Sequence, residues 1–125
     1  MDELYFLVSA IDHPRVKVCL DTRHLFAAGY DLSPQDVYEE FIDTFHHKIG
    51  LDSLAVIHIN DSKDPFQSGR DRHENLTKGT IPVSMFENLI NDRRLEDKTF
   101  IIETPGFDDN GPDKKNMDIL KSFIR

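Results

Sequence analysis

The chain has 125 residues, 38% hydrophobic and 30% charged, with a formal net charge of −8 at pH 7. This describes about one globular domain, and no apolar run is long enough to cross a membrane. The negative charge argues against broad electrostatic binding of nucleic acid, although bound cations could supply positive charge locally. A single cysteine rules out an internal disulfide and indicates a reducing, intracellular compartment.

The first half of the chain alternates between helix-like and strand-like patterns. Residues 2–12 read as a short helix, and residues 15–20 alternate apolar and polar side chains as a strand does. Ser33 and Pro34 then predict a helix start, with serine as the N-cap and proline in the first helical position. Apolar residues continue at helical spacing until Gly50, a plausible helix stop.

The second half repeats this alternation. Residues 54–59 form an apolar run typical of a strand covered on both faces. A helix is expected at 83–90, a third strand at 99–104 and a last helix at 114–125, with Asp113 as its N-cap. This order predicts an α/β fold in which helical crossovers connect parallel strands.

A long segment, residues 61–79, separates the second predicted strand from the next helix. Loops of this length without structure of their own are uncommon in compact domains and are usually functional or disordered. From the residues alone a solvated, mobile loop whose charges cancel is the preferred interpretation. The resemblance described below favours a working loop that folds back over the strand ends.

Imidazole and carboxylate side chains follow the predicted strands at their carboxyl ends, where parallel sheets place their working residues. Because alternate residues of a strand share a face, we expect these groups to converge. They are Asp21, His24, His58, Asp71, His73 and Glu103. Such a set suits zinc, manganese or iron and requires no thiolate.

Structural explanations exist for each residue taken singly. A lone histidine in a strand is more often hydrogen-bonded in a core than a ligand, and a lone Asp-x-His in a loop is more often a turn. The shared position at strand ends favours a metal site. His13, His46 and His47 lie outside that region, and Cys19 is expected to be a small core residue.

Three segments carry a resemblance to a known family. "CLDTRHLFAAGYDL", "IHINDSKDPFQSGRDRHENLTKG" and "IIETPG" resemble the signature segments of the endonuclease IV family of apurinic/apyrimidinic endonucleases, in order and over essentially the whole chain. The resemblance implies a zinc-dependent enzyme of DNA base excision repair on a (β/α)8 TIM barrel. Such an enzyme cuts the phosphodiester 5′ to an abasic site in double-stranded DNA, leaves a 3′-hydroxyl and clears blocked 3′ ends.

The motif match also implies roles for individual residues. His24, Asp71 and His73 would hold one zinc ion, and Asp21, His58 and Glu103 would hold a second and serve catalysis. Up to three zinc ions are expected in a complete enzyme. DNA-facing residues are expected in and beside the long loop, with Arg72 pointing away from its two ligand neighbours. They are Asn60, Ser62, Lys63, Arg70 and Arg72.

Two departures from the family pattern matter. Arg23 stands between two ligands where the family usually has cysteine, so its side chain is expected to point away from the metals or toward a phosphate. The family barrel also needs about 250 residues, and this chain supplies only part of it. Residues 1–125 are therefore expected to be the C-terminal portion of a larger domain, which requires the missing N-terminal strands or a companion chain.

Two other readings stay open. The first is an inactive fragment that binds zinc or a partner chain. The second is a metal-dependent sugar isomerase of related barrel type, although the long loop favours the nuclease.

Overall fold

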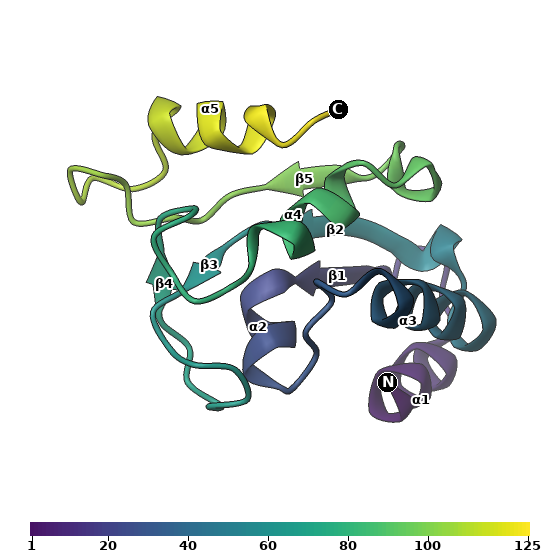
Figure 1. The fold of residues 1–125 in the computed structure, drawn as a ribbon. Helices are drawn as coiled ribbons and strands as arrows, with labels where there is room; N and C mark the ends of the chain where they lie inside the picture. The colour runs from purple at the N-terminus through teal and green to yellow at the C-terminus, as the bar shows by residue number, and fades with distance from the viewer.

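The fold centres on an open parallel sheet in the order β1-β2-β5, seen in a computed structural model of residues 1–125 (Figure 1). The strands are β1 (Val18–Asp21), β2 (Leu54–His58) and β5 (Thr99–Ile101). The two outer strands are shorter than predicted because strand pairing with β2 limits them. β1 begins at Val18, which pairs with Leu54 at the start of β2, and β5 ends at Ile101, which pairs with His58 at the end of β2. The predicted partial barrel of parallel strands is confirmed, and the sheet does not close.

Helices connect the strands and cover mainly one face of the sheet. They are α1 (Asp2–Ile11), α2 (Thr22–Ala27), α3 (Gln35–Lys48), α4 (Val83–Ile90) and α5 (Lys114–Ser122), with short 3-10 turns η1 (Leu51–Ser53) and η2 (Arg93–Leu95). None of them has the length and apolar character that a bilayer crossing requires.

The helix starts agree only in part with the sequence. Asp113 caps α5, as predicted, by accepting a hydrogen bond from the backbone N–H of Asn116. The predicted cap at Ser33 is wrong: α3 begins after Pro34 with no side-chain cap. The backbone N–H of Ser33 instead donates to Oδ1 of Asp31, so the turn before the helix is organised by the aspartate.

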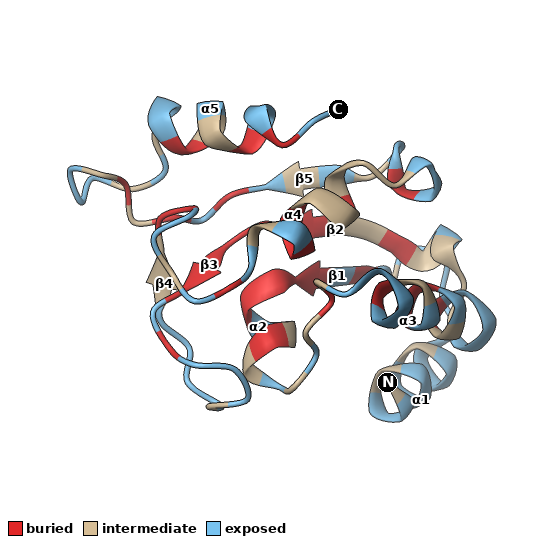
Figure 2. Cartoon of the chain, in the orientation of Figure 1, coloured by how far each residue is buried: buried red, intermediate tan, exposed pale blue.

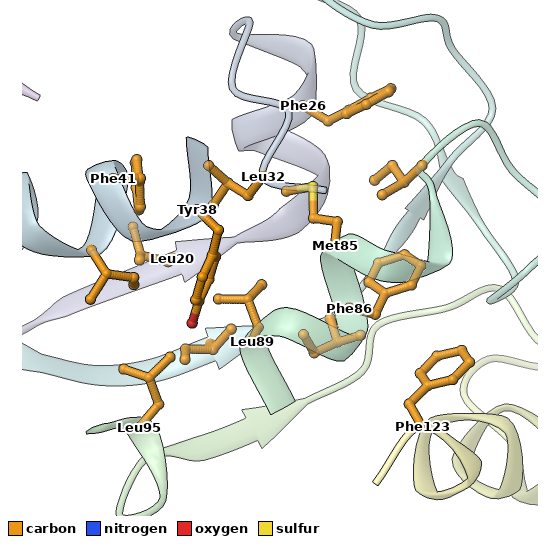
Figure 3. Packing of buried hydrophobic residues seen from close by; sticks show 14 of the residues in the cluster. Leu20, Phe26, Leu32, Tyr38, Phe41, Met85, Phe86, Leu89, Leu95 and Phe123 are labelled. Atoms are coloured by element: carbon orange, nitrogen blue, oxygen red, sulfur yellow. The ribbon is translucent and has the colours of Figure 1, made fainter. Parts of the chain in front are cut away.

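The hydrophobic core lies between the sheet and the helices on one face. Val18 and Leu20 of β1 and Ile57 of β2 point into it, as their alternation requires. Figure 3 shows side chains of α3 and α4, among them Tyr38 and Leu89, filling the space above the strands. The ring of Tyr38 is buried, and its hydroxyl donates to Oδ2 of Asp92 at 2.7 Å.

The opposite face of the sheet has no such cover. Cys19 of β1 and Ile101 of β5 are exposed, and Val56 of β2 is only partly buried (Figure 2). The expectation that Cys19 is a core residue is therefore wrong. Although Cys19 is exposed, neighbouring atoms remove part of the water around its thiol, and this desolvation, together with the carboxylates of Asp21 and Glu103, raises the pKa of the thiol.

The long loop after β2 is organised around buried polar groups. It contains two short antiparallel strands, β3 (Asp61–Ser62) and β4 (His73–Glu74). The carboxylate of Asp61 is buried and accepts hydrogen bonds from the backbone N–H groups of Ser62, Gly79 and Ile81. Burial nevertheless raises the pKa of Asp61. The loop therefore has a polar interior that fixes its path beyond the strand ends.

Candidate metal centre

Three ligand-type side chains meet at the carboxyl edge of the sheet. Asp21 ends β1, His58 ends β2, and Glu103 lies just beyond β5. Nδ1 of His58 is 2.6 Å from Oε1 of Glu103 and 3.5 Å from Oδ2 of Asp21. One ligand atom from each residue lies within 4.8 Å of the other two, and no other group of three in the chain meets this criterion.

Asn60 positions both carboxylates of this group. Its Nδ2 donates to Oδ2 of Asp21 at 3.1 Å and to Oε1 of Glu103 at 3.3 Å, while its Oδ1 accepts from the backbone N–H of Glu103 at 2.7 Å. The hydroxyl of Thr22 fixes the backbone of Asn60 by accepting from its N–H and donating to its C=O. Asn60 is fully buried, so this arrangement belongs to the interior of the protein.

The Asp21–His58–Glu103 group has the chemistry of a metal site. One imidazole and two carboxylates are ligands that suit zinc and similar divalent ions. Asp21 is buried, whereas the side chain of Glu103 is 45% exposed. The group is therefore open to solvent on one side, as catalytic sites with three protein ligands and a free position are.

The second predicted ligand set is only partly assembled. Nε2 of His24 lies 3.3 Å from Oδ2 of Asp71. His73 does not join them within 4.8 Å; its Nδ1 lies 2.7 Å from the backbone oxygen of Glu103, and its Nε2 has no protein partner. The structure thus brings two of the three residues into contact.

Arg23 lies directly against this pair. Its Nη1 forms an ion pair with Oδ1 of Asp71, and its Nη2 is 3.0 Å from Nε2 of His24. Arg23 therefore does not point away from the expected ligands, which was one of the two expectations for it. The residue lies in the first turn of α2, and its side chain, 3% exposed, is directed toward the nearest carboxylate.

The residues expected to face DNA divide into two groups. Asn60 and Ser62 are buried and make their hydrogen bonds within the protein, Ser62 with the backbone of Asp64, so neither is available to a phosphate. Lys63 and Arg70 are exposed.

Arg72 is exposed but is not the free cation that the sequence suggested. Its Nε lies 3.2 Å from both oxygens of the buried carboxylate of Asp64, and its Nη2 lies 2.5 Å from Oδ1. These hydrogen bonds hold the pKa of Asp64 below its ordinary value.

Sequence reasoning missed helix α2 and the positioning role of Asn60. Asp21 caps α2 by accepting from the N–H groups of Arg23 and His24. The signal for this helix in the sequence was Asp21 itself, because aspartate is a preferred N-cap residue. Asn60 shares a strand face with His58, but its double contact depends on residues far away in sequence.

Comparison with known proteins extends this description. A family model described as a xylose isomerase-like TIM barrel matches residues 1–123. The chain is 43% identical over 120 residues to a probable endonuclease 4 of Halothermothrix orenii, covering 95% of this chain and 43% of that protein. It is 45% identical over 105 residues to an apurinic-apyrimidinic endonuclease of Caenorhabditis elegans, covering 83% of this chain and 26% of that protein.

A solved structure agrees with the sequence relatives. The crystal structure of endonuclease IV from Thermus thermophilus superposes with a TM-score of 0.78 at 36% identity, covering 97% of this chain and 42% of that one. The chain spans less than half the length of these relatives.

Proposed function

This chain belongs to the xylose isomerase-like TIM-barrel family, and we propose that it is part of a zinc-dependent apurinic/apyrimidinic endonuclease. The reaction is hydrolysis of the phosphodiester 5′ to an abasic site in double-stranded DNA, together with removal of 3′ blocking groups. The convergence of Asp21, His58 and Glu103 at the open edge of the sheet carries the proposal. The endonuclease IV resemblance, confirmed by relatives with endonuclease names, supplies the substrate.

In this proposal Asp21, His58 and Glu103 hold the zinc ion. When bound, such an ion acts as a Lewis acid toward a phosphodiester and lowers the pKa of a coordinated water. Asn60 keeps the two carboxylates oriented by donating to both of them, as residues behind metal ligands commonly do. The exposed Lys63 and Arg70 supply positive charge toward the DNA backbone in a chain that is otherwise acidic.

Residues 1–125 would form the C-terminal portion of the barrel. Strands β1 and β5 are open parallel edges, and the face bearing Cys19, Val56 and Ile101 has no packing layer. Open edges favour pairing with further strands. The remaining strands, from the N-terminal portion or a companion chain, would cover this face and complete the site.

The open face also supports a second candidate, a non-catalytic fragment that binds zinc or a partner chain. A sugar isomerase is less well supported, because the relatives described above carry endonuclease names.

A chimeric enzyme tests the proposal. The matching segment of Thermus thermophilus endonuclease IV is replaced by residues 1–125, so that the remaining strands come from the homologue. We expect the zinc-loaded chimera to incise an abasic duplex and leave a 3′-hydroxyl that a polymerase extends. Glu103→Gln should abolish incision. A folded, zinc-loaded chimera no more active than its Glu103→Gln variant would contradict the proposal and favour the non-catalytic candidate.

A further inference from the structure

Arg23 sits where two ligand-type side chains meet. Its guanidinium forms an ion pair with Oδ1 of Asp71 and approaches Nε2 of His24 to 3.0 Å, while Nε2 of His24 and Oδ2 of Asp71 are 3.3 Å apart. The side chains of His24 and Asp71 are each 60% exposed, whereas that of Arg23 is only 3% exposed. The cation therefore lies beneath the pair, on the protein side.

This position is incompatible with a metal ion on the same donors. A metal would need the lone pair of Nε2 and a carboxylate oxygen, and the guanidinium already interacts with both. A guanidinium offers only hydrogen-bond donors and a positive charge, so it cannot share these acceptor atoms with a divalent ion. The like charges would also repel each other at this distance.

The guanidinium has one further charged neighbour, Asp21, at a longer distance. Oδ2 of Asp21 is 3.9 Å from Nη2, and the buried Nε has no hydrogen-bond partner. The third expected ligand, His73, uses Nδ1 to contact the backbone oxygen of Glu103, which leaves its Nε2 without a protein partner. The His24–Asp71 pair thus has a resident cation, while Nε2 of His73 stays free to act as a third ligand.

We propose that the guanidinium of Arg23 replaces a metal ion between His24 and Asp71. The inference rests on the proposed function, in which the chain holds zinc. It limits the number of ions: the chain binds one divalent ion, at Asp21–His58–Glu103, and none at the His24–Asp71 pair. The two places differ in their nearest donors. The neutral amide of Asn60 donates to both Asp21 and Glu103, and the guanidinium of Arg23 stays 3.9 Å from Oδ2 of Asp21.

Metal stoichiometry of the purified chain, measured by mass spectrometry after equilibrium dialysis against zinc, tests the inference. Arg23→Met keeps an unbranched, flexible side chain, although a shorter one, and removes the donors and the charge of the guanidinium. We expect about one zinc ion per wild-type chain and one more in the Arg23→Met variant. Adding Asp71→Asn to that variant should remove the extra ion. A folded Arg23→Met variant that gains none would overturn the inference.

The wild-type background gives a second test that does not require changing Arg23. His24 is exposed, so His24→Ala should fold normally, and we expect no change in the zinc content of the wild-type chain. A loss of one ion in His24→Ala would overturn the inference. His58→Ala reports on the proposed function instead, since it should remove the single wild-type ion. If His58→Ala keeps its zinc ion, the proposed function is contradicted. The difference in zinc content between Arg23→Met and wild type still decides the inference about Arg23.

Discussion

His58 and Glu103 meet at the carboxyl edge of the sheet, with Nδ1 of the histidine 2.6 Å from Oε1 of the carboxylate. Their strands are neighbours in the sheet but are separated in sequence by the long loop and helix α4. Parallel pairing places both residues at the same edge, where Asp21 of β1 joins them. The proposed metal site is thus a consequence of strand order and register.

Asn60 offers a test of how far the site depends on positioning. Asn60→Ala removes the amide that donates to Asp21 and Glu103, so the two carboxylates lose their shared anchor. We expect the zinc affinity to fall by roughly 10–100-fold, with the number of bound ions unchanged. Competition with a chromophoric chelator measures the affinity. Asn110→Ala, at an exposed loop position, is the control and should leave it unchanged.

Lys63 tests the proposed DNA contact of the long loop. Its side chain is exposed, and no ion pair within the chain engages it. Lys63→Ala in the chimera should weaken binding to an abasic duplex and reduce the slope of log affinity against log salt by about one unit. Titrations at several salt concentrations measure the slope.

Lys121, exposed on α5, provides the matched control. Lys121→Ala should change neither affinity nor slope. Equal effects of the two substitutions would indicate a general charge effect and contradict a specific contact at Lys63.

Gly79 tests the packing of the long loop. A side-chain Cβ at this position would collide with the backbone oxygen of Ser62 and with the carboxylate of Asp61, which backbone N–H groups hold in place. Gly79→Ala should therefore lower the free energy of unfolding by about 1–3 kcal/mol. Urea denaturation measures it, and Ser84→Ala, at an exposed position of α4, should change it by less than about 0.5 kcal/mol.

The Arg72–Asp64 pair predicts a pH-dependent contribution to stability. Hydrogen bonds from Arg72 lower the pKa of Asp64 in the folded protein, so the contribution is present above the unfolded value of about 3.9 and is lost as the pH falls through the lowered pKa. Arg72→Gln should destabilise the chain at pH 7, and the difference from wild type should shrink in strong acid. Urea midpoints across this pH range measure the change.

Arg93 forms no ion pair and lies on η2, so Arg93→Gln is a suitable control that should show no pH-dependent difference. A wild-type advantage over Arg72→Gln that persists undiminished below the lowered pKa would show that the aspartate is not its source.

The parallel sheet and its edge could be predicted because the signals for them are local. Alternation in β1 and β2 fixes which side chains share a face, and helical crossovers make the strands parallel. Together these place Asp21, His58 and Glu103 at one edge before any contact is known. The burial of Cys19 was predicted wrongly because alternation shows which residues share a face of the sheet but not which face the helices cover.

The surroundings of the site depend on contacts between distant residues. Asp64 is buried because its backbone oxygen accepts from Thr80 and its carboxylate from Arg72. Arg23 follows the first turn of α2, a helix of only six residues whose start is set by the side chain of Asp21. No periodicity in the sequence reveals such directions, so neither the burial of Asp64 nor the contact of Arg23 with Asp71 could be predicted.

The most direct measurement is an anomalous difference map from crystals of the chain grown with zinc. The account predicts a zinc peak within about 2.0–2.2 Å of Nδ1 of His58 and of carboxylate oxygens of Asp21 and Glu103. An ordered structure with no peak at these three residues, or with zinc only elsewhere, would contradict it.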